Sequence, residues 1–214
     1  LVINSPGGSP VQASIIHDKI VQLKKKYKKK VVVEGVDALA SGAYLIATAA
    51  DDIYVHPDTL TGSIGVIMSS FGFTGAMEKV GVTRRVFTAG TNKDRLDPFK
   101  PLTPADTTKI HQVLTVAHQN FIKDVLQGRG NRLHGSQAEL FSGDFWTGTT
   151  ATKLGLVDGT ANLWVVLEKQ FNVENYRDYT TKPSIIEMLF GGIGTVLHLK
   201  LANNAPGLKS VLGN

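Results

Sequence analysis

Short blocks of apolar residues alternate with polar and glycine-containing turns along the chain, and they predict an α/β fold. The first block, Leu1-Val2-Ile3, is typical of a short buried strand, and residues 5–8 are typical of a turn. Ser9 and Pro10 then mark a helix start, as N-cap and first helical residue. The next apolar positions recur at helical spacing and predict an amphipathic helix: Val11, Ile15, Ile16, Ile20, Leu23 and Tyr27.

Further strands and helices follow over short spacings. Strands are predicted at residues 31–33, 53–55, 64–68 and 84–88, and a helix of small residues at about 42–50. Because strands and helices alternate so closely, we expect a mostly parallel sheet covered by helices.

One long helix dominates the second half of the chain. Polar residues 89–101 predict an exposed loop, and Thr103-Pro104-Ala105-Asp106 is a strong capping sequence. The apolar stripe behind it predicts an amphipathic helix that ends near residues 128–130. Three shorter elements are expected after it: a helix near 147–154, a strand at Leu156-Val157 and a helix near 161–171.

The 214 residues are expected to form one domain, residues 1–180, with an apolar helical extension at residues 181–214. Glycines interrupt the extension, which predicts a docked or groove-binding segment rather than a membrane span. The chain begins at Leu1 without a signal peptide, so we expect a missing N-terminal part that carries any membrane anchor.

The charge of the chain is concentrated in one run. The net charge is +5, but the six lysines within residues 24–30 leave 17 basic against 18 acidic residues elsewhere. This run predicts a solvated helix end, where lysines meet the negative end of the helix dipole, rather than a surface for phosphate or anionic lipid. It gives no support to nucleic-acid binding.

Several kinds of site are excluded by what the sequence lacks. Without cysteine the chain can have no disulfides, thiol catalysis or Cys-ligated zinc. It contains no P-loop, dinucleotide fingerprint or H-E-x-x-H motif, so we expect no cofactor and no metal. His111 and His118 share a helix face, which is more typical of a surface pair than of a metal site.

Two glycine turns carry the candidate chemistry. The turn at Gly7 and Gly8 leads from a strand into a helix, so its backbone N–H groups could face a cleft, as an oxyanion hole requires. Ser41 lies between Ala40 and Gly42 at the start of a buried helix, where the N–H of Gly42 could be a second donor. Each turn alone is also compatible with an ordinary strand-to-helix connection.

A nucleophilic serine needs a general base. His56 follows Ser41 by 15 residues, but no acidic residue is placed to orient it. A lysine could act as the base if burial lowered its pKa from about 10.4 to about 7–8. The residues alone do not choose among the lysines.

The order of the motifs is more specific than any one of them. They are Asn4-Ser5-Pro6-Gly7-Gly8, Ala40-Ser41-Gly42-Ala43-Tyr44, Ala50-Asp51, Leu60-Thr61-Gly62-Ser63-Ile64-Gly65-Val66, Thr147-Gly148 and Gly155-Leu156-Val157-Asp158. Together, over about residues 1–170, they resemble the signal peptide peptidase A (SppA) family, including its SohB-like branch. The resemblance implies a Clp/crotonase-type fold and a serine peptidase with a Ser-Lys dyad. It implies acyl transfer from remnant signal peptides and other short hydrophobic or unfolded peptides.

The resemblance also assigns roles to residues. Ser41 is the implied nucleophile, the amides of Gly7 and Gly42 form the oxyanion hole, and Ser63 lines the cleft. The family's lysine lies in a loop before a long helix, which fits Lys93, 52 residues after Ser41, with Lys100 as the near rival. The Clp protease family is disfavoured because Val66 stands where that family has its catalytic His.

The resemblance implies an assembly as well. It implies a homo-oligomeric ring or dome in which Ser41 and Lys93 come from neighbouring subunits, at the bacterial inner membrane with the catalytic domain outside the cytoplasm. Two alternatives stay open. One is a non-catalytic oligomeric scaffold of the same fold that binds membrane partners, and the other is a crotonase-like acyl-CoA enzyme.

Overall fold

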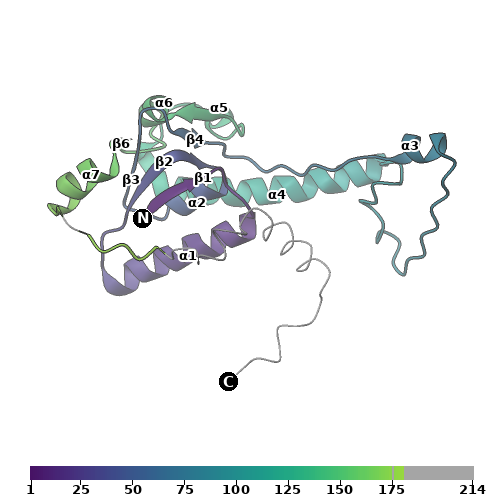
Figure 1. Ribbon diagram of the computed structural model, residues 1–214, viewed down its shortest axis with the longest axis horizontal. Helices are drawn as coiled ribbons and strands as arrows, with labels where there is room; N and C mark the ends of the chain where they lie inside the picture. The colour runs from purple at the N-terminus through teal and green to yellow at the C-terminus, as the bar shows by residue number, and fades with distance from the viewer. Residues whose placement is uncertain (175, 181–214) are drawn as a thin grey trace, which may run out of the picture. The chain divides into compact units, whose positions relative to one another are not determined.

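A nine-residue strand, β2 (Val32–Ala40), is the centre of the sheet in the computed structural model (Figure 1). β1 (Val2–Ser5) pairs with it in parallel, and so do β3 (Asp52–Val55) and β4 (Leu60–Gly62), which follow one another along its length. Two short strands complete the sheet: β6 (Gly159–Thr160) is parallel to β3, and β5 (Phe145–Thr147) is antiparallel to β4.

The structure describes residues 1–174 and 176–180. It divides into one compact unit at Leu1–Glu174 and a second unit of which only residues 176–180 are described. The extension predicted at residues 181–214 lies outside the described residues. Within the described part, no helix is both long and apolar enough to cross a membrane.

The three main helices begin at their predicted starts, although Ser9 and Ser41 make no capping hydrogen bond with their side chains. α1 (Pro10–Tyr27) begins after Ser9, α2 (Gly42–Ala47) after Ser41, and α4 (Pro104–Arg129) after Thr103. The Thr103 side chain accepts from the Asp106 amide while Asp106 accepts from the Thr103 amide, which is a complete capping box. The shorter helices are α3 (Thr74–Lys79), α5 (Gln137–Leu140), α6 (Gly148–Lys153) and α7 (Leu163–Val166), with a 3-10 turn at Gly130–Arg132 and a π-type turn at Leu167–Phe171.

The α/β class is confirmed, while the likeness to the Clp/crotonase type stays a prediction. The core lies where α1, α2 and α4 meet the sheet. Its largest fully buried hydrophobic side chains are Tyr44, Leu39, Ile53, Ile64, Leu156, Val33, Val55, Val125 and Val157.

Three predicted strands differ from the structure. Residues 64–68 and 84–88 are irregular, and the strand expected at Leu156-Val157 forms instead at Gly159–Thr160. Residues 81–90 are all exposed, and no strand of the described residues lies beside 84–88 to supply hydrogen bonds. β4 ends before residue 64 because Ser63 has a positive φ of 51°, which breaks the extended backbone.

The lysine run is partly held in ion pairs. Lys24 lies 2.8 Å from Asp51, and Lys30 lies 2.8 Å from Asp52. Lys28, the C-cap of α1, takes a left-handed conformation that ends the helix. The run therefore fastens the end of α1 to the start of β3, which supports its interpretation as a helix end.

A buried ionic cluster anchors the C-terminal end of α4 to the sheet. Arg129, only 3% exposed, donates to both carboxylate oxygens of Asp158 at 2.7 and 3.0 Å and to the Gly155 carbonyl. Asp158 also accepts from Arg132 and from the amide of Ile53 in β3. The motif at residues 155–158 is thus part of the framework that holds α4 in place.

The same motif also anchors α2. The Tyr44 hydroxyl donates to the Leu156 carbonyl at 2.7 Å, and burial raises the pKa of Tyr44 above its usual value. Two of the motifs that carry the family resemblance are therefore joined directly by a buried hydrogen bond.

Asp158 should contribute stability that depends on pH. Burial alone would raise the pKa of Asp158, but the hydrogen bonds and charge of Arg129 lower it below its usual value. We predict that Asp158→Asn lowers the free energy of unfolding by about 3 kcal/mol at pH 7, because Arg129 is left buried without a counter-charge. Urea denaturation measures this, with the exposed Asp58→Asn as the control.

The sign of the pH dependence follows from the lowered pKa. The stabilisation is present above the unfolded-state pKa of about 3.9 and is lost as the pH falls through the lower folded-state value. The difference between the wild type and Asp158→Asn should therefore shrink in acid. An undiminished difference well below pH 3.9 would contradict this account.

Candidate active site

Ser41 occupies a strained turn between β2 and α2. Its φ of 52° and ψ of −125° are uncommon for a residue with a side chain and cost about 1–3 kcal/mol. The Ser41 amide donates to the Gly62 carbonyl at 2.8 Å, and its carbonyl accepts from the Leu45 amide at 2.9 Å, so the turn is held from both sides. A sharp strand-to-helix turn presents a serine hydroxyl outward, as nucleophilic serines require.

The turn after β1 lies directly against Ser41. Gly7 has a φ of 115°, and a Cβ atom there would lie 2.7 Å from the Ser41 Cβ and 3.0 Å from the Gly42 nitrogen. Only glycine allows both this conformation and this approach. The two glycine turns of the sequence therefore form one site.

The backbone amides of this site differ in what they bind. The Gly7 amide donates to the Ser5 hydroxyl at 3.2 Å, so it is already engaged. The amide of Gly8 has no acceptor among the described residues, and the amide of Gly42 has none within α2 because it is the first helical residue. The structure therefore favours Gly8 in place of Gly7 as the partner of Gly42, with Gly7 shaping the turn.

Two adjoining pockets border Ser41. The first, about 320 Å³, lies between α1, α2 and α4 and is walled mainly by apolar side chains. The second, about 400 Å³, is more polar and includes Ser63, His118 and Ser142. Ser63 thus borders a pocket that also includes Ser41. Both pockets include Gly8 and Gly65, so the cleft runs along both sides of the serine.

His118, which the sequence analysis placed in a surface pair with His111, instead borders the cleft. It is half-buried, and its Nε2 lies 2.9 Å from the carbonyl of Ile64, which fixes the segment after β4 against α4. The sequence pattern of α4 did indicate that His118 faces inward, because it lies three residues, about one helical turn, before the buried Phe121. Among the described residues no cluster of His and acidic side chains could hold a metal ion.

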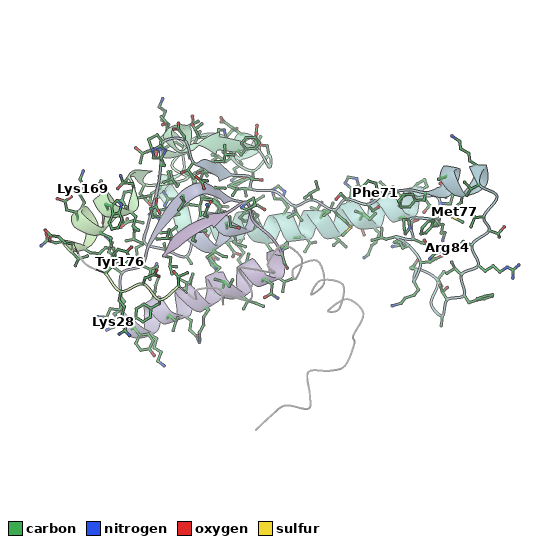
Figure 2. The ribbon with its side chains drawn as sticks, viewed as in Figure 1. Lys28, Phe71, Met77, Arg84, Lys169 and Tyr176 are labelled. Carbon is green, nitrogen blue, oxygen red and sulfur yellow. The ribbon has the colours of Figure 1, made fainter. Side chains whose placement is uncertain are left out.

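Lys93 lies in a different part of the unit from Ser41. Residues 71–101 gather around the N-terminal end of α4, away from the sheet, and Figure 2 shows Phe71, Met77 and Arg84 there. Arg84 pairs with Asp97 at 3.0 Å, and Arg95 pairs with Asp106 in the first turn of α4 at 2.9 Å. The loop that carries Lys93 is therefore fixed at this end of the helix.

The length of α4 separates Lys93 from Ser41. Asp106 holds the lysine loop and His118 borders the serine pocket, 12 residues farther along α4, which corresponds to roughly 18 Å of helix. The structure of one chain therefore does not bring Ser41 and Lys93 together. Lys93 is exposed, and its side chain has no hydrogen bond or ion pair within residues 1–174.

Lys100, the rival lysine, is engaged in an ion pair. Its Nζ lies 3.0 Å from Asp94, and this hydrogen bond holds the pKa of Asp94 below its usual value. His56, the other candidate base, is exposed and lies 3.7 Å from Asp58. It lines neither of the two pockets that include Ser41.

Comparison with known proteins gives a consistent family. The sequence profile of "Peptidase family S49" matches residues 23–172. The chain is 31% identical over 181 residues to "Protease 4" from Haemophilus influenzae, and 30% identical over 162 residues to "Serine protease SPPA, chloroplastic" from Arabidopsis thaliana. It is 46% identical over 169 residues to a protein named "Na(+)/H(+) antiporter NhaA" from Brucella melitensis.

The matches cover most of this chain but only a small part of each relative. The matches cover 84%, 75% and 79% of this chain, but only 29%, 24% and 23% of the three relatives, in the order given. The chain thus spans about a quarter of the length of these proteins. More than three quarters of the antiporter-named protein lies outside the match, so its name assigns nothing to the matched segment.

The contact between the two turns predicts unequal effects of two neighbouring substitutions. Gly7→Ala should lower the free energy of unfolding by more than about 1 kcal/mol, because its φ is positive and its Cβ would collide with Ser41. Gly8→Ala is the matched control, because a Cβ there meets nothing within 4 Å. Urea denaturation of both variants tests this, and equal loss in the two would show that the approach of the turns is not tight.

Proposed function

The chain belongs to peptidase family S49, the SppA/SohB-like peptidases, and from this premise we propose that it is a serine peptidase acting through Ser41 and Lys93. The observation that carries the proposal is the strained turn of Ser41, which lies against the Gly7 turn and lines a largely apolar pocket together with Gly8 and Gly42. Backbone strain of this kind persists where the surrounding structure enforces it, and it is typical of catalytic turns.

The proposed reaction is acyl transfer. The neutral amine of Lys93 takes the proton from the Ser41 hydroxyl, and the oxygen attacks the carbonyl carbon of the scissile peptide bond. The amides of Gly8 and Gly42 donate to the oxyanion that forms. The lysine ammonium then protonates the leaving amine, the C–N bond breaks, and an acyl ester remains on Ser41. Water, deprotonated by the same lysine, hydrolyses this ester and restores the serine.

The separation along α4 makes the dyad intermolecular in this proposal. Lys93 of one subunit enters the cleft of its neighbour, where burial disfavours the ammonium and so activates the base. The segment around the lysine loop carries apolar side chains that one chain leaves exposed, among them Phe71 (78%), Val80 (72%) and Phe87 (92%). Exposed apolar side chains of this size, gathered on one segment, support contact with another subunit.

The apolar pocket supports short hydrophobic or unfolded peptides as substrates. Remnant signal peptides are such peptides, and their source would place the enzyme at the bacterial inner membrane, with its catalytic part outside the cytoplasm. Membrane association is proposed to come from sequence outside this chain. A non-catalytic scaffold would not need the strained Ser41 turn, which favours the enzyme.

Loss of either proposed dyad residue should abolish turnover. We predict that Ser41→Ala and Lys93→Ala each lower kcat/KM for a fluorogenic hydrophobic peptide by at least about 1,000-fold, because nucleophile and base act as a unit. Lys100→Ala is the matched control and should retain activity. Circular dichroism checks that each variant is folded. Retained activity in Lys93→Ala with loss in Lys100→Ala would move the base to Lys100, and activity in Ser41→Ala would refute the proposal.

Mixed oligomers test the intermolecular dyad. When inactive Ser41→Ala and Lys93→Ala subunits are mixed and reassembled, some sites combine an intact Ser41 with a neighbour's intact Lys93. At an equal ratio with random mixing, about a quarter of the sites should recover. No recovery in oligomers shown by mass spectrometry to contain both variants would contradict the intermolecular arrangement.

A further inference from the structure

We infer that the apolar pocket beside Ser41 selects a basic side chain, lysine or arginine, next to the scissile bond, and that Asp124 is the residue that selects it. The inference rests on the proposed peptidase function and adds a substrate preference to it. It follows from one carboxylate at the end of a mainly apolar pocket.

The pocket is a channel between two helices. α1 contributes Pro10, Val11, Ser14 and Ile15, and α4 contributes Ala117, Asn120, Phe121 and Asp124. The α4 residues recur at spacings of three and four, so they form one stripe that faces α1. Leu45 of α2 adds a further apolar wall. Such walls suit the methylene stem of a long side chain.

Asp124 lies at the far end of this channel from the serine. α4 runs alongside α2, because His118 contacts the Ile64 carbonyl near Ser41 and Gly128 lies against the Thr48 carbonyl just after α2 ends. Asp124 is six residues beyond His118, which corresponds to about 9 Å along the helix. A side chain that carries its charge at the end of a long apolar stem can span such a depth.

The Asp124 carboxylate is unpaired in the part of the chain that the structure describes. It is half-buried, and within residues 1–174 it makes neither a hydrogen bond nor an ion pair. Other shielded aspartates of the unit each pair with a lysine or arginine: Asp51, Asp52, Asp94, Asp97, Asp106 and Asp158. Asp124 is thus a shielded negative charge that faces an open pocket, and a substrate cation would supply the missing partner.

The chemistry resembles that of trypsin, where an aspartate in the specificity pocket sets the preference for a basic residue. Here the apolar walls bind the stem and Asp124 binds the ammonium or guanidinium. A neutral side chain of equal length contacts the apolar walls but leaves the Asp124 carboxylate unpaired. The pocket therefore distinguishes lysine from norleucine, which have nearly the same stem, by charge alone.

The test compares two fluorogenic peptides that differ only at the residue before the cleaved bond, lysine or norleucine. With the assembled wild-type enzyme, kcat/KM should be at least about tenfold higher for lysine. In Asp124→Asn this lysine-to-norleucine ratio should fall at least about tenfold, while Asp124→Glu, which keeps the charge, should retain a ratio above one. Asp18→Asn, which removes an exposed carboxylate of α1, is the control and should leave the ratio unchanged.

Two results would overturn the inference. One is a wild-type ratio near one, and the other is a ratio that Asp124→Asn leaves unchanged while both peptides are cleaved more slowly. The second result would mean that Asp124 pairs with a residue of the assembly, such as the Lys93 of a neighbour. Failure of the proposed function is distinguishable, because Ser41→Ala would then still cleave both peptides.

Discussion

The approach of the Gly7 turn to Ser41 is the contact on which the site depends. β1 and β2 are parallel, so both strands end at the same edge of the sheet, and a register shift between Ile3 and Ser5 redirects the end of β1. The missing side chain at Gly7 lets its turn contact Ser41, while Ser41 holds a conformation that strand and helix enforce together. Ser41, Gly8 and Gly42 therefore line one pocket.

α4 connects this site to the rest of the unit and keeps the proposed base away from it. Its C-terminal end is tied to the sheet by Arg129 and Asp158, and its N-terminal end holds the lysine loop through Asp106 and Arg95. Both ends are ionic and shielded, so the helix acts as a spacer of fixed length. A dyad of Ser41 and Lys93 therefore needs a second subunit, and assembly becomes a condition of catalysis in the proposed function.

The sequence predicted best the elements whose starts or apolar patterns are visible within the segment itself. Thr103 and Asp106 form the expected capping box, and α1, α2 and β3 lie close to their predicted positions. Residues 84–88 have the composition of a strand, but no strand in the described part of the chain pairs with them, and composition cannot supply one. The pairing partner of a strand is a property of the fold rather than of the segment.

The candidate site, too, could be predicted only in part from the sequence. The motifs predicted that Ser41 and the glycine turns matter. They did not predict that Ser5 engages the Gly7 amide, while the Gly8 amide has no acceptor among the described residues. His118 and Asp124 were hidden because a helix stripe shows which residues face inward, not whether they meet a core or a pocket. The separation of Ser41 from Lys93 likewise depends on the direction of α4, which no local pattern encodes.

The distance between Ser41 Oγ and Lys93 Nζ across subunits of the assembled enzyme, from an experimental structure, tests the central claim most directly. We predict a hydrogen-bond distance of about 2.6–3.2 Å between neighbouring subunits, with the lysine enclosed in the cleft. An assembly in which every Lys93 stays in solvent, while another basic residue contacts Ser41, would contradict it.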